Sequence, residues 1–239
     1  PVTSAYAKTY FEKAQELIES GRETEARRAL RQELSQRPNH LEARYNLAIL
    51  LERIEHTDEA EKVYQQNMRH GLHLPTMINL SAIYTRQGKR KESVELLKMA
   101  AKRFRSEAPP YYLLAQRAED DNNLRLARTY FQKAIRADPL NGFAHIRFGR
   151  FLSAHGQVSQ ALIHARRAIK LVPDCAPCWQ IQGDILWKAG NLKRSYAAYQ
   201  KSSALSPNVK LRTTMAKLLH SMGETERAEA IERSLKLTP

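Results

Sequence analysis

A repeat of about 34 residues runs through the chain and constrains its fold more than any other feature. Pro139, Pro173 and Pro207 lie 34 residues apart, and each follows a mixed apolar and polar segment typical of a helix end. Extending this period places units near residues 7, 41, 74, 108, 142, 176 and 209, which fill the chain from residue 7 to residue 239. A period of this length is typical of stacked repeats rather than of a single globular core.

Three kinds of position recur within a unit. The eighth residue is small: Ala14, Ala48, Ser81, Ala115, Gly149, Gly183 and Ala216. The fifteenth is usually a helix breaker: Gly21, Glu55, Gly88, Asn122, Gly156, Gly190 and Gly223. The twentieth is small again: Ala26, Ala60, Ser93, Ala127, Ala161, Ser195 and Ala228.

These positions predict a pair of antiparallel helices in each unit. A glycine at the fifteenth position ends the first helix, because it enters the left-handed conformation without a Cβ penalty. Small residues at the eighth and twentieth positions allow the two helices to approach closely. A proline at the end of the unit stops the second helix. One pair cannot bury its apolar faces alone, so the pattern predicts a stack with nearest-neighbour contacts.

The pattern resembles the tetratricopeptide repeat (TPR) family, most clearly where Trp179, Gly183, Tyr199 and Pro207 occupy the family's characteristic positions. The resemblance implies an all-α, right-handed solenoid of about seven repeats forming one domain over residues 1–239. The expected repeats cover residues 7–40, 41–73, 74–107, 108–141, 142–175, 176–208 and 209–239. The third repeat has Arg105 where proline is expected, so we expect its second helix to run a few residues longer.

Composition excludes several classes of protein. With 42% hydrophobic residues, 9 Gly and 10 Pro, the chain is neither disordered nor collagen-like. The longest apolar runs, such as Leu47–Leu51, are far shorter than the roughly 18 residues of a membrane span. The chain begins with Pro1 rather than Met, so we leave its compartment open between the cytoplasm and a bacterial periplasm.

No motif for catalysis or cofactor binding is found in the sequence. A P-loop, a dinucleotide fingerprint, a nucleophile elbow and a zinc-protease motif are all absent. His70 and His73 have a metal-ligand spacing, but no Asp, Glu or Cys cluster supplies further ligands, which favours a solvated loop. We therefore expect no catalytic residues, no cofactor and no metal.

Cys175 and Cys178 form a Cys-x-x-Cys pair that suits a redox site, half a zinc site or a haem linkage. A second pair for zinc is absent, and Trp179 stands where haem attachment requires histidine. Pro177 is compatible with a helix start, and one helical turn would bring the two residues within disulfide distance. We predict reduced, packed thiols in a loop that seats Trp179 against the neighbouring repeat.

The resemblance implies a binding groove lined by the first helix of each repeat. Carried onto this chain, the partner-binding residues are Tyr45, Asn46, Asn79, Tyr112, Gln116, Arg147, Arg150 and Asp184. Aromatic faces beside Asn, Arg and Gln suit an extended peptide or a partner helix. Asn46 and Asn79 resemble the asparagines with which the family contacts a ligand backbone. Relatives that read chaperone tails use a Lys/Asn/Asn/Lys/Arg set, which this chain matches only at Asn46.

The net charge of +14 is concentrated in one part of the chain. Residues 122–206 contain 13 Lys and Arg against 3 Asp and Glu. We define a basic surface on the second helices of repeats four to six: Arg128, Lys133, Arg136, Arg166, Arg167, Lys170, Lys193 and Arg194. Such a surface is either a solvated helix face or a contact for an acidic protein, anionic lipid or nucleic acid.

The sequence therefore favours a non-enzymatic scaffold that binds a protein or peptide in the groove, with an acidic partner as a second candidate. The alternative is binding of nucleic acid (RNA) through the basic surface of repeats four to six, as the isoelectric point near 9.9 suggests. Stacking aromatic residues do not accompany that surface, which weighs against the alternative.

Overall fold

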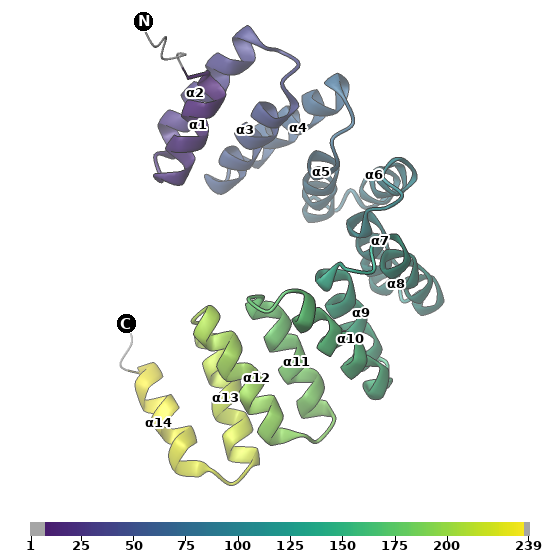
Figure 1. Cartoon of the computed structure of the whole chain (residues 1–239), viewed down its shortest axis with the longest axis vertical. Helices are drawn as coiled ribbons and strands as arrows, with labels where there is room; N and C mark the ends of the chain where they lie inside the picture. The colour runs from purple at the N-terminus through teal and green to yellow at the C-terminus, as the bar shows by residue number, and fades with distance from the viewer. Residues whose placement is uncertain (1–7, 237–239) are drawn as a thin grey trace, which may run out of the picture. The chain divides into compact units, whose positions relative to one another are not determined.

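The computed structural model describes residues 8–236, and these form fourteen α-helices and no strand (Figure 1). The expected all-α fold is therefore confirmed. The helices are α1 (Tyr10–Glu19), α2 (Glu23–Gln36), α3 (Leu41–Arg53), α4 (Thr57–His70), α5 (Leu74–Arg86), α6 (Arg90–Arg103), α7 (Ala108–Asp120), α8 (Leu124–Ala137), α9 (Gly142–Ala154), α10 (Val158–Leu171), α11 (Ala176–Lys188), α12 (Leu192–Leu205), α13 (Val209–Ser221) and α14 (Thr225–Lys236).

The helices pair in chain order, so that each odd-numbered helix packs on the even-numbered helix after it. Contacts divide the chain into two compact units, one up to Arg105 with α1–α6 and one from Ser106 with α7–α14. Each unit is described by itself below. The organisation as one continuous domain stays a prediction.

Every pair turns through a left-handed residue at the fifteenth position. Five of these residues are glycines with φ between 73° and 80°, and the others are Glu55 at 62° and Asn122 at 55°. The geometry closes a hydrogen bond back to the first helix, as between the Arg22 N–H and the Leu17 carbonyl at 2.8 Å. The His56 N–H makes the same bond to the Leu51 carbonyl at 3.0 Å, so the turn forms without glycine as well.

The small residues at the eighth and twentieth positions are all buried where the two helices of a pair meet. In the sixth pair the contact is close: a Cβ added to Gly183 would lie 2.4 Å from Cε1 of Tyr199. There the Ser195 hydroxyl also donates to the Gly183 carbonyl at 2.8 Å. The small residues therefore set the helix spacing, as the pattern predicts.

The expectation of a longer second helix in the third repeat is wrong. α6 ends at Arg103 and has 14 residues, the same number as α8. Phe104 leaves the helical conformation and packs against the core of the N-terminal unit. Pro109 and Pro110 instead lie in the first turn of α7, where a missing backbone N–H costs little. Packing of Phe104 thus ends the helix without a proline.

First helices also contact one another. In the C-terminal unit α9 packs on α7 and α11 in addition to its partner α10. In each unit, we call the side of the first helices that faces away from the second helices the first-helix face. The second helices α8, α10 and α12 lie on the other side of α7, α9 and α11.

Candidate functional site

In the N-terminal unit the first-helix face contains a groove between α1 and α3. It has a volume of about 280 Å³ and is lined by Gln15, Ile18, Glu19, Asn46, Ile49, Leu50 and Arg53. Asn46 is half-buried, and its amide makes no hydrogen bond within residues 8–236. An amide with free donors and acceptor beside apolar side chains is able to bind the backbone of a partner segment.

Asn79 has the equivalent position on α5 but a different environment. Its amide donates to the Tyr64 hydroxyl at 3.0 Å and to the Tyr45 hydroxyl at 3.4 Å. The Tyr64 hydroxyl in turn donates to Glu52 Oε1 at 2.8 Å, and burial raises the pKa of Tyr64. The amide donors of Asn79 are therefore engaged inside the protein. The two asparagines do not form an equivalent pair.

In the C-terminal unit the first-helix face places Arg147 of α9 over Tyr112 of α7. The guanidinium carbon lies 4.8 Å from the ring centroid, which is a cation–π contact. Burial lowers the pKa of Arg147 and raises the pKa of Tyr112. No carboxylate pairs with Arg147 among the described residues. This partly desolvated cation is available to an incoming acceptor.

The other predicted groove residues of the C-terminal unit are Gln116, Arg150 and Asp184. Gln116 is half-buried on α7, and Arg150 is exposed with its Nη2 atom 3.9 Å from Glu119 Oε2. Asp184 on α11 accepts a hydrogen bond from the Tyr199 hydroxyl at 2.6 Å. The structure thus brings Tyr112 and Arg147 into contact in one unit and Tyr45 and Asn79 in the other.

Seven members of the basic surface are exposed on α8, α10 and α12, whereas Arg128 is half-buried and donates to Gln157 Oε1 at 2.7 Å. No ion pair to a carboxylate is found for any of the eight in the described part of the chain. The N-terminal unit differs, because Arg31, Arg53 and Lys89 pair with Glu59, Glu23 and Glu61 across neighbouring repeats. Positive charge is therefore left uncompensated on the second helices of the C-terminal unit.

Sequence reasoning missed a second groove. Its volume is about 310 Å³, and α10, α11 and α12 line it through Leu162, Arg166, Trp179, Gln182, Leu186, Arg194, Ala197, Ala198 and Lys201. We call it the Trp179 cleft. Its cations were visible in the sequence, but nothing in the repeat pattern showed that they surround an apolar floor.

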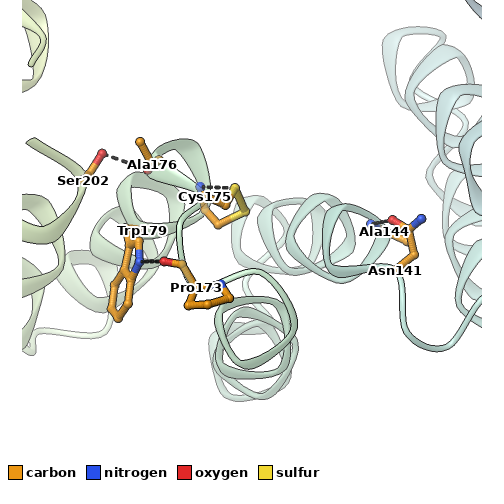
Figure 2. The surroundings of a disulfide bond; sticks show 8 residues. Asn141, Ala144, Pro173, Cys175, Ala176, Trp179 and Ser202 are labelled. Atoms are coloured by element: carbon orange, nitrogen blue, oxygen red, sulfur yellow. Dashed lines mark hydrogen bonds between the residues drawn. A yellow bond between two sulfur atoms is a disulfide. The ribbon is translucent and has the colours of Figure 1, made fainter. Parts of the chain in front are cut away.

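The prediction of reduced cysteines is wrong, because the structure joins Cys175 and Cys178 in a disulfide (Figure 2). Cys175 caps α11 and its sulfur accepts from the Cys178 N–H at 3.2 Å, while the Cα atoms are 5.2 Å apart. The first turn of the helix thus brings both residues within bonding range. Trp179 follows directly, and its indole N–H donates to the Pro173 carbonyl at 2.7 Å (Figure 2).

The described residues contain no group of three or more His, Cys, Asp and Glu suited to a metal ion. His73 caps α5 through Thr76, and its Nε2 atom lies 3.0 Å from Glu42 Oε1. Among the helices of residues 8–236, none is long and apolar enough to span a membrane.

Comparison with known proteins gives the family. Tetratricopeptide repeat models match residues 17–72, 112–174 and 176–209, which together are more than half of the chain. The chain belongs to the TPR family. A curated relative is the DnaJ homolog subfamily C member 7 homolog of Schizosaccharomyces pombe, 24% identical over 170 residues. That match covers 64% of this chain and 35% of the relative, so it spans about a third of that protein.

Solved structures share the TPR fold. A chain of the APC/C hetero-tetramer Cut9-Hcn1 matches with a TM-score of 0.75 and 16% identity, over 99% of this chain and 48% of that chain. A TPR protein from Parabacteroides merdae matches with a TM-score of 0.67 and 17% identity. That match covers 95% of this chain and 91% of that chain. These similarities, with the family matches, make the chain an α-helical repeat solenoid and a protein-interaction scaffold of a typically non-catalytic family.

Proposed function

We propose that this scaffold binds an extended peptide segment or a helix of a partner protein on its first-helix face. The observation that carries the proposal is the position of Arg147 over Tyr112. A half-buried guanidinium without a carboxylate retains several hydrogen-bond donors, and the flat tyrosine ring beside it offers apolar contact area. Together they suit a segment that presents backbone carbonyls or a carboxylate next to an apolar side chain.

The groove around Asn46 supports the same function in the N-terminal unit. Its apolar lining by Ile18, Ile49 and Leu50 offers space for a side chain, while the free amide of Asn46 is able to pair with a backbone. Asn79 contributes differently: it holds Tyr45 and Tyr64 in place. The proposed contact residues are therefore Tyr45 and Asn46 in the N-terminal unit, and Tyr112, Gln116, Arg147, Arg150 and Asp184 in the C-terminal unit.

A phage-displayed library of random peptides selected on the wild-type chain tests the proposal. The affinity of each selected peptide is then measured against the double variant Arg147→Glu/Arg150→Glu. The matched control is Lys133→Glu/Arg136→Glu, which reverses two cations at the same spacing on α8. We expect about tenfold weaker binding for the first variant and little change for the control. Circular dichroism must show equal helicity for both.

Selected peptides that bind the first variant as tightly as the wild type would place binding away from this face. Peptides that respond only to the control variant would move the site to the basic surface. Neither result would alter the membership of the TPR family.

A further inference from the structure

The Trp179 cleft has an apolar floor and a positively charged rim. Leu186 and Ala198 are buried and Leu162 and Trp179 are half-buried, so the floor is made of apolar side chains from three helices. Ala197 and Ala198 of α12 have small side chains, which leave space in the cleft for a side chain of a partner. About 310 Å³ is near the lower end of the roughly 300–1,000 Å³ of ligand pockets, which suits one or two side chains.

The rim has three cations that the protein itself does not neutralise. Arg166 of α10 and Arg194 and Lys201 of α12 are exposed, and none has a carboxylate partner among residues 8–236. Residues 122–206 contain only 3 acidic side chains. Asp138 caps the Leu140 N–H at 3.1 Å, and Asp184 accepts from Tyr199. The third, Asp174, is exposed and forms no ion pair with any of these cations. The rim cations are therefore available to the negative charge of another molecule.

The floor is also held in position before any partner arrives. The indole N–H of Trp179 is bonded to the Pro173 carbonyl, and the residue lies one position after the disulfide (Figure 2). At the first residue of α11, the Ala176 carbonyl accepts a hydrogen bond from Ser202 of α12 at 2.8 Å. A surface that is already ordered loses less entropy on binding, which favours affinity.

We propose that the Trp179 cleft is a docking site for an acidic peptide segment of a partner protein. One apolar or aromatic side chain of the segment fills the floor, and flanking Asp or Glu side chains pair with Arg166, Arg194 and Lys201. This site is separate from the first-helix face, so it extends the proposed function rather than depending on it.

The chemistry of the cleft favours such a segment over a nucleic acid. Binding of single strands uses several aromatic rings in series along a charged groove, whereas Trp179 is the one aromatic residue lining this cleft. Phosphates alone would not use the floor of Leu162, Leu186 and Ala198. In an acidic peptide, carboxylates on both sides of an apolar side chain would pair with the rim cations while that side chain packs on the apolar floor.

The test uses a fluorescein-labelled acidic peptide with one central phenylalanine between short Asp-Glu runs, followed by fluorescence anisotropy. The companion peptide replaces that phenylalanine with alanine. Three forms of the full chain are compared with wild type. Arg194→Glu/Lys201→Glu reverses the rim, Ala197→Trp fills the cleft without changing charge, and Lys170→Glu/Lys193→Glu reverses two exposed cations on α10 and α12 outside the cleft.

We expect affinity for the phenylalanine peptide to fall about tenfold or more in the rim and filled-cleft variants, and about twofold or less in the control. The alanine peptide should bind the wild type about tenfold more weakly. Ala197 is exposed, so tryptophan there leaves the core intact, and circular dichroism checks this. The variant Arg147→Glu/Arg150→Glu should bind the peptide normally, which separates this site from the first-helix face.

Several results would overturn the proposal. Equal binding to wild type and Ala197→Trp would show that the cleft is not used. An equal loss in the rim and control variants, or equal binding of both peptides, would show general charge attraction. Competition by an RNA oligonucleotide or by phosphatidylserine vesicles, together with insensitivity to Ala197→Trp, would assign the surface to those ligands instead.

Discussion

Tyr199 of α12 packs its ring edge directly on the backbone of Gly183 in α11, so closely that a Cβ on the glycine would lie 2.4 Å from Cε1 and 2.5 Å from Cδ1. Tyr199 is fully buried, and its hydroxyl reaches Asp184 on the first-helix face. Burial, followed by the hydrogen bond to Asp184, raises the pKa of Tyr199. One residue pair therefore fixes the spacing of the sixth helix pair and positions a proposed groove residue.

Gly183→Ala should lower the free energy of unfolding by about 1–3 kcal/mol, because the added methyl group displaces a buried ring. Urea titration followed by circular dichroism measures the loss. In a Tyr199→Leu background the same substitution should cost clearly less, since the clashing atoms are absent. An equal cost in both backgrounds would show that helix propensity, and not the contact, causes the effect.

Glu55→Gly should stabilise the N-terminal unit by about 1 kcal/mol, because Glu55 occupies a left-handed conformation that penalises a side chain. The matched control is Gly88→Ala at the equivalent turn, where φ is 73° and a Cβ would meet no atom within 4 Å. Gly88→Ala should lower the free energy of unfolding by about 1 kcal/mol. The added Cβ meets no neighbouring atom, so this cost comes only from the left-handed backbone conformation. Thermal unfolding midpoints moving in the same direction for both variants would contradict the interpretation.

Asn67→Ala should destabilise the N-terminal unit by about 1–3 kcal/mol, because it removes both hydrogen bonds that the buried Asn67 amide donates. The fully buried Asn67 amide donates to the Leu41 carbonyl at 3.1 Å and to the Thr76 hydroxyl at 2.7 Å, which links α4 to α3 and α5. Asn39→Ala is the control, since Asn39 is exposed. Urea unfolding measures the stability of both variants. Similar unfolding midpoints for Asn67→Ala and Asn39→Ala would show that the Asn67 hydrogen bonds do not stabilise the unit.

Protein purified without reductant and alkylated at once should contain no free thiol, because Cys175 and Cys178 are bonded to each other. Reduction should lower the free energy of unfolding by less than the roughly 3 kcal/mol expected for a disulfide that closes a loop of about 15 residues. The reason is that Cys175 and Cys178 are separated by only 3 positions. Mass spectrometry counts the thiols, and thermal unfolding with and without reductant gives the cost. Two free thiols in folded, unreduced protein would contradict the disulfide.

His145 and His164 should make the C-terminal unit less stable as pH falls. Their Nδ1 atoms are 3.0 Å apart, and burial, followed by the neighbouring His145, lowers the pKa of His164 to about 4. Burial lowers the pKa of His145 as well. Both therefore bind protons less readily in the folded state than in the unfolded chain, whose histidine pKa is about 6.5.

The stabilising contribution of the pair is thus complete above about pH 6.5 and is lost as pH falls towards about 4. Uptake of one proton on unfolding would change the free energy of unfolding by roughly 1.4 kcal/mol per pH unit. His164 is partly exposed, so we expect its contribution to be smaller than this. His164→Gln should flatten the pH dependence of the unfolding midpoint, whereas the exposed control His70→Gln should not. Identical pH profiles for the wild type and His164→Gln would rule out this linkage.

The turn and contact positions were predictable because they obey local rules. A left-handed residue at a fixed place and small residues where helices cross repeat with the period of the chain, so they are visible in one sequence. The turns at Glu55 and Asn122 formed despite the missing glycine, because the rest of the pair enforces them. The end of α6 was not predictable in this way, since it depends on where Phe104 finds a packing partner.

Sequence by itself therefore determined the all-α repeat architecture, the residues of the first-helix face and the concentration of positive charge between residues 122 and 206. Tertiary structure alone decided which side chains meet. It engaged Asn79 with two tyrosines while leaving Asn46 free, set Arg147 on Tyr112, joined the cysteines and enclosed Trp179 among three cations. The physical reason is that periodicity fixes the face of a helix on which a residue lies, whereas a partner on another helix is fixed only when the helices pack.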